Sequence, residues 1–212
     1  MTPESPGKIS PQTRNSEATR RSLIKAVGDV LAEKGFAGLG VNAVARQANV
    51  DKVLIYRYFD GLPGLMKAFG QEGDFWPSFQ ELTGGDLENF RLLTFEDKLI
   101  SLGRNFLKGI RARPLTQEIM AWETGHRNKL TEELEKLREA QMLRFYEEFL
   151  STEKTDIDLM AVTAIIGGGL SYLVCRSRHI RWYNGVDLKD EEGWTRIETA
   201  VEQIIKAAVQ TK

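Results

Sequence analysis

Lys52, Tyr56, Arg57 and Tyr58 gather two positive charges and two phenolic hydroxyls within a short stretch of the chain. Positively charged side chains neutralise phosphates, and tyrosine hydroxyls donate hydrogen bonds to phosphate oxygens. The surrounding stretch, residues 41–59, is predicted to form two short helices joined by a tight turn, with these four side chains on the second helix. A helix-turn-helix uses this arrangement to place a helix in the major groove of DNA.

The elements that must position these side chains can be traced from residue spacing. Apolar residues recur at helical intervals from about 16 to 34, and Gly35 follows, where a glycine can take the left-handed conformation that often ends a helix. A second, shorter helix is expected over about 42–48. Asn49 then occupies the turn, and asparagine tolerates a positive φ better than most residues.

The second helix of the motif has a predicted start and a predicted inner face. Asp51 is expected to cap its first turn, because a carboxylate accepts hydrogen bonds from free backbone N–H groups. Ile55 and Phe59 lie four residues apart and should pack inward together. Lys52 and Tyr56 would then point outward, toward DNA.

The rest of the chain is predicted to be helical, with no strand of useful length. Residues 62–75 should form a helix, followed by a loop-rich piece containing Pro77, Gly84 and Gly85. Long amphipathic helices are expected near 95–112, 114–124, 127–150, 156–180 and 191–210. The predicted fold class is therefore all-α.

Composition and charge fit a globular protein that binds DNA at one end. The 212 residues are 42% hydrophobic and 28% charged, with a net charge of −1. Residues 1–60 nevertheless contain nine Lys and Arg against six Asp and Glu, so the basic charge lies at the N-terminal end. The single cysteine, Cys175, favours a reducing, cytoplasmic setting. We expect no membrane span, because the most apolar run, 159–175, is interrupted by polar residues and glycines.

The helix over 16–34, Gly35-Phe36 and the run VNAVARQANVDKVLIYRYFDGLPGL together resemble the N-terminal signature of the TetR-like (AcrR-type) bacterial transcriptional regulators. The resemblance covers about residues 16–66. It implies a three-helix helix-turn-helix DNA-binding domain over residues 15–61 after a flexible tail, 1–14. It further implies a helical ligand-binding and dimerisation domain over residues 62–212.

The resemblance also implies specific contacts with double-stranded DNA. Asn42 would contact the backbone or a base at the start of the second helix of the domain. Lys52, Val53 and Leu54 would lie in the exposed first turn of the recognition helix, where lysine can reach phosphates or guanine and the apolar pair can meet thymine methyl groups. The predicted DNA-binding residues are Asn42, Lys52, Val53, Leu54, Tyr56, Arg57 and Tyr58.

Three positions depart from the pattern of the resembling family. Gly40 stands where a capping Ser or Thr is usual, and Asn49 replaces the usual turn glycine. Leu62 replaces a lysine that commonly anchors a phosphate, which should weaken the salt-dependent part of DNA binding. Since Val53 and Leu54 offer no hydrogen-bonding side chains, recognition of DNA shape should carry more weight.

Other residue patterns give no sign of catalysis or of a cofactor. Gly167–Gly169 lacks the preceding strand and the Gly-Lys-Ser/Thr of a nucleotide loop, so close helix packing, a kink or a ligand pocket are the better accounts. His126 and His179 have no partners at metal-ligand spacing. No Ser/His/Asp set or carboxylate pair has defensible spacing, so we expect no catalytic residues, no metal and no enzyme activity.

A small-molecule pocket is expected in the helical body, because apolar sites lined by aromatic residues are typical of such ligands. The candidates for its lining are Phe106, Met120, Trp122 and Tyr172. With few buried charges evident, a largely hydrophobic ligand is expected. By the resemblance, the helices near 156–180 and 191–210 would form the four-helix interface of a homodimer.

The sequence thus predicts a ligand-responsive transcriptional regulator, a repressor that binds a palindromic operator as a homodimer. An alternative stays open, in which the chain is a helical protein-interaction module whose degenerate helix-turn-helix no longer reads DNA. Gly40, Leu62 and the apolar recognition helix are its motivation. A third possibility, an all-α enzyme, has no residue constellation behind it.

Overall fold

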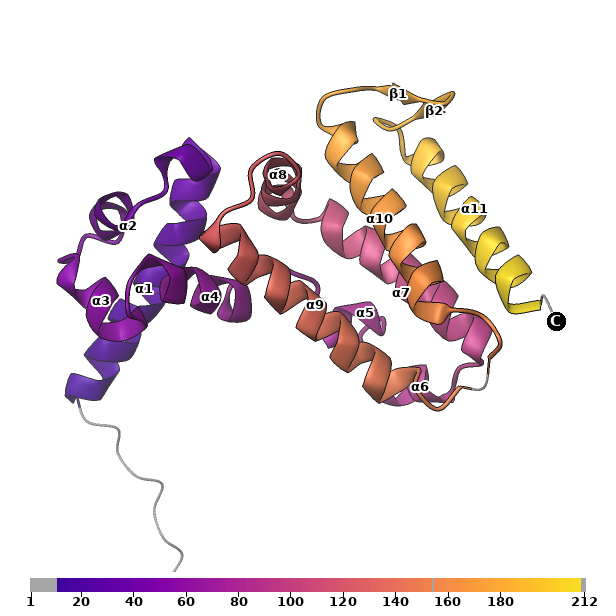
Figure 1. Cartoon of the computed structure of the whole chain (residues 1–212), viewed down its shortest axis with the longest axis horizontal. Coiled ribbons are helices and arrows are strands. Elements are labelled where there is room, and N and C mark those ends of the chain that lie inside the picture. Colours follow the sequence, from indigo (N-terminus) through magenta and orange to yellow (C-terminus); the bar gives the residue numbers. More distant parts are fainter. Residues whose placement is uncertain (1–10, 154, 211–212) are drawn as a thin grey trace, which may run out of the picture. The chain divides into compact units, whose positions relative to one another are not determined.

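The computed structural model describes residues 11–153 and 155–210, and this part of the chain is almost entirely helical, as Figure 1 shows. The all-α prediction is therefore correct. Contacts between residues divide the chain into two compact units. The first comprises the chain up to Gly73 together with Asn128–Leu134, and the second comprises Asp74–Arg127 and the chain from Glu135 onward.

The first unit contains a three-helix arrangement followed by a fourth helix. Its elements are α1 (Pro11–Lys34), a 3-10 turn (Phe36–Gly38), α2 (Val41–Gln47), α3 (Val53–Phe59) and α4 (Leu62–Glu72). Helix α1 packs against α2 and α4, and α3 packs against α4. Apolar side chains at helical spacing form the buried centre, among them Leu23, Val27, Val30, Val44, Ile55, Leu65, Met66 and Phe69.

Helix α1 ends as predicted but begins earlier. Gly35 has a φ of +60°, the left-handed geometry expected after the helix. At the other end α1 starts at Pro11, so residues 11–14 are helical and the prediction of a tail over them is wrong. The remainder of that predicted tail, residues 1–10, lies outside the described residues.

An ion pair and a ring contact fasten α1 to α3 and α4. Both terminal nitrogens of the Arg20 guanidinium donate to the carboxylate of Glu72. The Arg20 guanidinium carbon also lies 5.3 Å from the centre of the Phe59 ring. These hydrogen bonds with Arg20 lower the pKa of Glu72. Arg20 is thus engaged in packing within the unit.

The second unit is organised around α7 (Phe95–Arg111). Helix α7 contacts α5 (Phe79–Leu82), α8 (Pro114–Glu123), α10 (Leu159–Ser177) and α11 (Glu191–Gln210). It can do so because buried apolar residues recur along it, including Leu99, Leu102, Phe106, Leu107 and Ile110.

Four phenylalanines join α9 (Lys129–Phe149) to the short helices before α7. The ring centres of Phe79 and Phe145 are 5.5 Å apart at an interplanar angle of 90°. Those of Phe90 and Phe149 are also 5.5 Å apart at 90°, in the edge-to-face geometry that aromatic pairs favour. The apolar side chains of α9, an amphipathic helix as predicted near 127–150, therefore form an inward stripe that is part of the core.

The structure contains two short helices and a hairpin that were not predicted from the sequence. The expected loop-rich piece contains α5 and α6 (Leu87–Leu92), and α5 begins with a capping box in which Ser78 and Glu81 bond each other's backbone N–H. Strands β1 (Trp182–Tyr183) and β2 (Val186–Asp187) pair antiparallel through the turn at Asn184-Gly185. Asn-Gly is a strong hairpin signal, and both of its residues have positive φ.

Helix α10 corrects a further expectation. By length and composition it is apolar enough to cross a membrane, contrary to the prediction that no run is long enough. In the second unit this helix packs one side against α7 and α8. Much of its remaining surface is exposed, including Met160, Ile165 and Tyr172.

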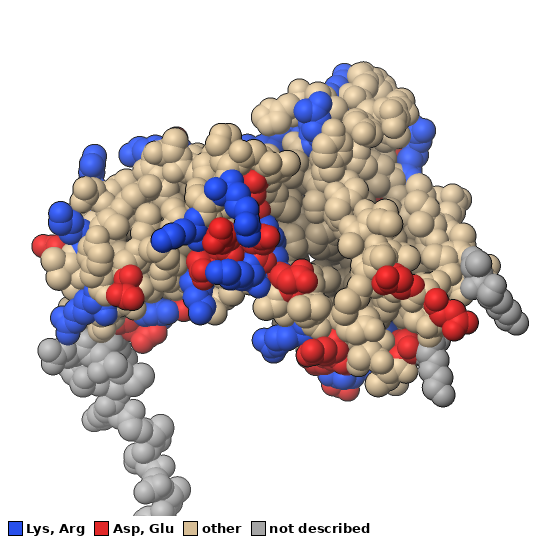
Figure 2. Space-filling model, viewed as in Figure 1, with Lys and Arg blue, Asp and Glu red and all other residues tan. Residues whose placement is uncertain are grey.

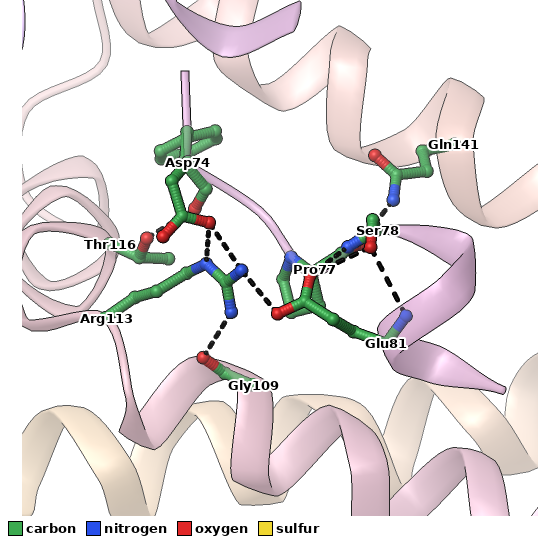
Figure 3. A network of polar contacts seen from close by, with 9 residues as sticks. Asp74, Pro77, Ser78, Glu81, Gly109, Arg113, Thr116 and Gln141 are labelled. Atoms are coloured by element: carbon green, nitrogen blue, oxygen red, sulfur yellow. Dashed lines mark hydrogen bonds and ion pairs between the residues drawn. The ribbon is translucent and has the colours of Figure 1, made fainter. Parts of the chain in front are cut away.

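A buried guanidinium fixes the segment that opens the second unit (Figure 3). Arg113 donates to the Asp74 carboxylate from Nε at 2.8 Å, to Glu81 at 2.7 Å and to the Gly109 carbonyl at 2.9 Å. Burial would raise the pKa of Glu81, but hydrogen bonds from Arg113 and Ser78 outweigh it and leave that pKa lowered. Segment 74–81 is thereby held against α7.

Two more side chains hold the same segment by its backbone. The Thr116 hydroxyl donates to the Phe75 carbonyl, and Gln141 Nε2 donates to the Pro77 carbonyl at 2.5 Å. These donors come from α8 and α9, so helices distant in sequence converge on residues 74–78 (Figure 3). Backbone carbonyls in this irregular segment thus obtain the partners that regular structure would otherwise supply.

Replacing Arg113 by alanine should lower the free energy of unfolding by about 2–3 kcal/mol, because charged hydrogen bonds and a buried stem are lost together. Urea denaturation followed by circular dichroism measures the change. Arg104→Ala is the matched control: its ion pair with Glu202, at 3.2 Å, is largely exposed and should contribute less than about 1 kcal/mol. Equal effects of the two substitutions would show that the Arg113 network does not stabilise the unit.

Candidate functional site

The turn between α2 and α3 has the geometry that the sequence predicts. Asn49 adopts a φ of +53°. The Asp51 carboxylate accepts a hydrogen bond from the Val53 N–H at 2.8 Å, which satisfies a free donor at the start of α3. Gly40 precedes α2 without any side-chain cap, as expected from its missing hydroxyl.

Helix α3 has one buried and one exposed face. Ile55 is fully buried and Phe59 is nearly so, which fixes the rotation of the helix about its axis. Val53 and Tyr56 are 61% and 58% exposed, high values for large apolar and aromatic side chains. The exposed face of α3 is therefore available for a partner, and its apolar exposure is concentrated in a few neighbouring residues.

The structure brings most of the predicted DNA-binding residues to the surface. Asn42, Lys52, Val53, Tyr56 and Arg57 are exposed, whereas Leu54 and Tyr58 are half-buried. Two of these side chains also contact each other: the Arg57 guanidinium carbon lies 5.9 Å from the centre of the Tyr58 ring. Their roles toward DNA stay predictions, since placement alone does not assign them.

A cavity of about 450 Å³ lies in the second unit, a size typical of small-molecule sites. Helices α7, α9 and α10 supply most of its lining, and Trp76 adds an aromatic ring from segment 74–78. The lining is dominated by apolar and aromatic side chains, among them Leu102, Phe106, Met142, Phe145, Tyr146, Ile166, Leu170 and Ile205. Glu139, Thr163 and Ser171 are its main polar members.

Only one of the four predicted pocket residues lines this cavity. Phe106 does, but Met120, Trp122 and Tyr172 do not. Trp122 on α8 stacks on His126 with ring centres 5.1 Å apart, and Tyr172 on α10 is half exposed and meets Tyr183 edge to face. Aromatic type was thus a poor guide to the cavity. The better signal was the inward stripe of α9, which carries Met142 and Phe145.

The three glycines of α10 do not serve close packing within the described chain. A Cβ at Gly167 would reach only Phe106, at 4.0 Å, and none would meet another atom within 4 Å at Gly168 or Gly169. Gly167 and Gly168 instead line the cavity. The absence of side chains there keeps space open in the cavity. These glycines are therefore better explained by the pocket than by packing against a neighbouring helix of the same chain.

Comparison with known protein families decides the assignment of the first unit. Residues 23–69 match the family model of bacterial regulatory proteins, tetR family. The helix-turn-helix region of this chain, residues 23–69, is thus of the tetR type. This match indicates a DNA-binding regulator of transcription. The matched residues span α2, the turn, α3, half of α1 and most of α4.

Solved structures share the fold of this chain at low sequence identity. The fatty acid degradation regulator FadR from Bacillus halodurans is 20% identical, with 97% of this chain and 100% of that chain covered and a TM-score of 0.62. FadR from Bacillus subtilis, solved with stearoyl-CoA, is 18% identical over 90% and 97% of the chains, also with a TM-score of 0.62.

A third similar structure is NalD from Pseudomonas aeruginosa, the secondary repressor of the MexAB-OprM multidrug efflux pump. It is 15% identical over 92% of this chain and 98% of that chain, with a TM-score of 0.60. At such identities the likeness concerns the fold alone. The search of curated protein sequences found no match to this chain.

Replacing Asn49 should reveal how much the turn of this tetR head depends on its left-handed residue. Asn49→Ala should lower the free energy of unfolding by about 1 kcal/mol, because a Cβ without a polar group is disfavoured at positive φ. Asn49→Gly should leave it unchanged or raise it. Thermal unfolding measures both variants, with the exposed helical substitution Gln47→Ala as control. A stable Asn49→Ala variant would contradict the strain argument.

Proposed function

We propose that this protein is a ligand-responsive repressor that inserts α3 into the major groove of a palindromic operator. The single observation that carries this proposal is the rotation of α3. Because Ile55 and Phe59 are buried, Lys52, Val53 and Tyr56 face outward from a helix that follows a tight turn. This is the geometry in which the second helix of a helix-turn-helix reads DNA.

In the proposed complex each exposed side chain has a distinct chemical task. Lys52 supplies charge to a phosphate or to a guanine edge, and the Tyr56 hydroxyl donates to a phosphate oxygen. Val53 presents an apolar surface to a thymine methyl group. Asn42 at the first turn of α2 and Arg57 on α3 add contacts to the backbone. Half-buried Leu54 and Tyr58 expose only part of their side chains and contribute at the edge of the contact.

The affinity of this head should depend on few polar groups. Gly40 offers no hydroxyl to a phosphate, and half-buried Leu62 provides no charge at the start of α4. Hydrogen bonds to bases would then come mainly from Lys52. Recognition of groove shape would therefore contribute more to sequence specificity than base contacts do.

A homodimer built from α10 and α11 would give the two heads that a palindromic operator requires. Ile165 on α10 and Ile204 on α11 are 76% and 55% exposed. The surface over these helices is largely free of charged residues in Figure 2. Pairing these faces between two copies would remove apolar area from water. The dimer would then carry two α3 helices, one for each of two major grooves, which lie roughly 34–36 Å apart on DNA.

The cavity of the second unit is the proposed ligand site, and its apolar lining favours a small, largely hydrophobic molecule. A ligand that binds one arrangement of the helices more tightly shifts the population toward it and changes DNA affinity. In this function the protein acts in the cytoplasm, by binding alone, without a cofactor or a chemical reaction.

Lys52→Ala and Tyr56→Ala should each weaken binding to the protein's own promoter DNA. For Lys52→Ala, the slope of log affinity against log salt should fall by about 1 per subunit, since a phosphate contact is lost. For Tyr56→Ala, affinity should fall about tenfold, or about 1.4 kcal/mol. Fluorescence anisotropy at several salt concentrations measures both effects.

Tyr56→Phe separates the hydroxyl from the ring, and Lys189→Ala, an exposed charge in the second unit, serves as the neutral control. If both alanine variants bind DNA like the unmodified protein, α3 is not the reading helix. Weak, sequence-blind DNA binding with retained binding to a protein partner would favour the interaction-module alternative.

Ile165→Glu should convert the dimer to a monomer, because it places a charge in the middle of the proposed apolar interface. Analytical ultracentrifugation measures the mass in solution. Leu92→Glu is the matched control: Leu92 is 85% exposed but lies on α6, outside the interface, so this variant should stay dimeric. A dimeric Ile165→Glu variant would place the interface elsewhere.

A further inference from the structure

We infer that the cavity binds an amphiphilic organic cation, with an apolar body against the helices and its positive group beside Glu139. This inference rests on the proposed function, because it names the chemical class of the ligand at that same site. It is carried by the charges of the lining, by the pairing of the nearby cations and by the aromatic rings of the walls.

Among the described residues, the lining has one carboxylate and no positively charged side chain. Glu139 on α9 is the only acidic residue in this described lining, which contains no Lys, Arg or His. The Glu139 side chain is exposed and, within the described residues, makes no ion pair or hydrogen bond. Its charge is therefore free to attract a cation that enters the cavity.

The cations nearest in sequence to the lining are already engaged. Arg138 holds Glu123 with both terminal nitrogens, at 3.1 and 2.6 Å, and Lys98 on α7 pairs with Glu153 at 2.6 Å. Arg144 lies over the Phe79 ring, 5.6 Å from its centre. An anionic ligand would find none of these charges in the cavity wall, and burying an unpaired carboxylate is unfavourable.

The aromatic walls suit a positive group for an independent reason. Phe106, Phe145 and Tyr146 all line the cavity beside Trp76, whose ring already has the Arg138 guanidinium carbon 5.4 Å from its centre. The face of an aromatic ring attracts cations, particularly quaternary ammonium groups. The Tyr146 and Ser171 hydroxyls can accept or donate, so they do not discriminate between charges.

The wall formed by α10 admits the apolar body of such a ligand. Gly167 and Gly168 contribute backbone without side chains, and a Cβ at Gly168 would meet open space. Nearby Ile166 and Leu170 provide apolar contact. A chain or ring system can therefore lie along α10 while its head group reaches toward α9.

A matched series of ten-carbon amphiphiles tests the inference: decyltrimethylammonium, decanol and decanoate, each below its aggregation concentration. Dissociation constants for the full chain are measured by isothermal titration calorimetry. We expect decyltrimethylammonium to bind at least tenfold more tightly than decanoate. Glu139→Gln should weaken cation binding about fivefold to tenfold and leave decanol unchanged, and Glu139→Lys should reverse the order of cation and anion.

Glu147→Gln is the control, because Glu147 is an exposed carboxylate on the same helix but is not part of the lining. Decanoate binding as tightly as the cation, or Glu139→Gln acting like the control, would overturn the charge inference and leave the ligand site in place. If none of the three compounds binds, the inference fails. Failure of DNA affinity to respond to any bound compound would instead contradict the proposed ligand-responsive function.

Discussion

Helix α10 imposes the main constraint on the second unit, because it carries more apolar surface than its own chain covers. Leu159, Leu170 and Val174 are buried, whereas Met160, Ile165 and Tyr172 remain exposed. A helix that is apolar on most sides must be covered by something else, either a membrane, a partner or a ligand. Part of the uncovered surface of α10 borders the cavity, because two of its glycines leave space there that side chains would otherwise fill. In the proposed dimer a second copy covers the exposed remainder, so the proposed ligand site and the proposed interface are two faces of one helix.

In the first unit the orientation of α3 is the corresponding constraint. This helix has only two turns, and its Ile55 and Phe59 side chains are buried. A short helix has little stability of its own, so its orientation depends on the packing of these side chains and on the turn before it. Asn49 in the left-handed conformation and the Asp51 cap set the direction of entry. Arg20 then braces the same region by contacting Phe59 and Glu72. In the proposed complex, reading of DNA by α3 would thus depend on residues that do not belong to the proposed DNA contact.

Local features of the sequence predicted local features of the structure. Gly35, Asn49 and Asp51 could be assigned because turn and cap geometry depends on a few adjacent residues. The capping box at Ser78 and Glu81 and the Asn184-Gly185 turn carried equally local signals, which an expectation of loops and long helices overlooked. The cavity was harder to predict, because its lining depends on how α7, α9 and α10 are rotated against one another. Met120, Trp122 and Tyr172 have suitable side chains but lie on other faces, and Glu139 looks like any charge on an amphipathic helix.

Residues 74–78 belong both to a locally specified segment and to the cavity formed by the packing of distant helices. Trp76 lines the cavity, while Arg113, Thr116 and Gln141 hold the residues on either side of it. A ligand in contact with Trp76 would therefore press on a segment whose neighbours are fixed to α7, α8 and α9. Because packed segments have few discrete arrangements, such contact favours one arrangement over another more readily than it bends the segment gradually. The same segment directly follows α4 in the chain, so in the proposed regulator it is the shortest covalent route from the cavity to the DNA-binding unit.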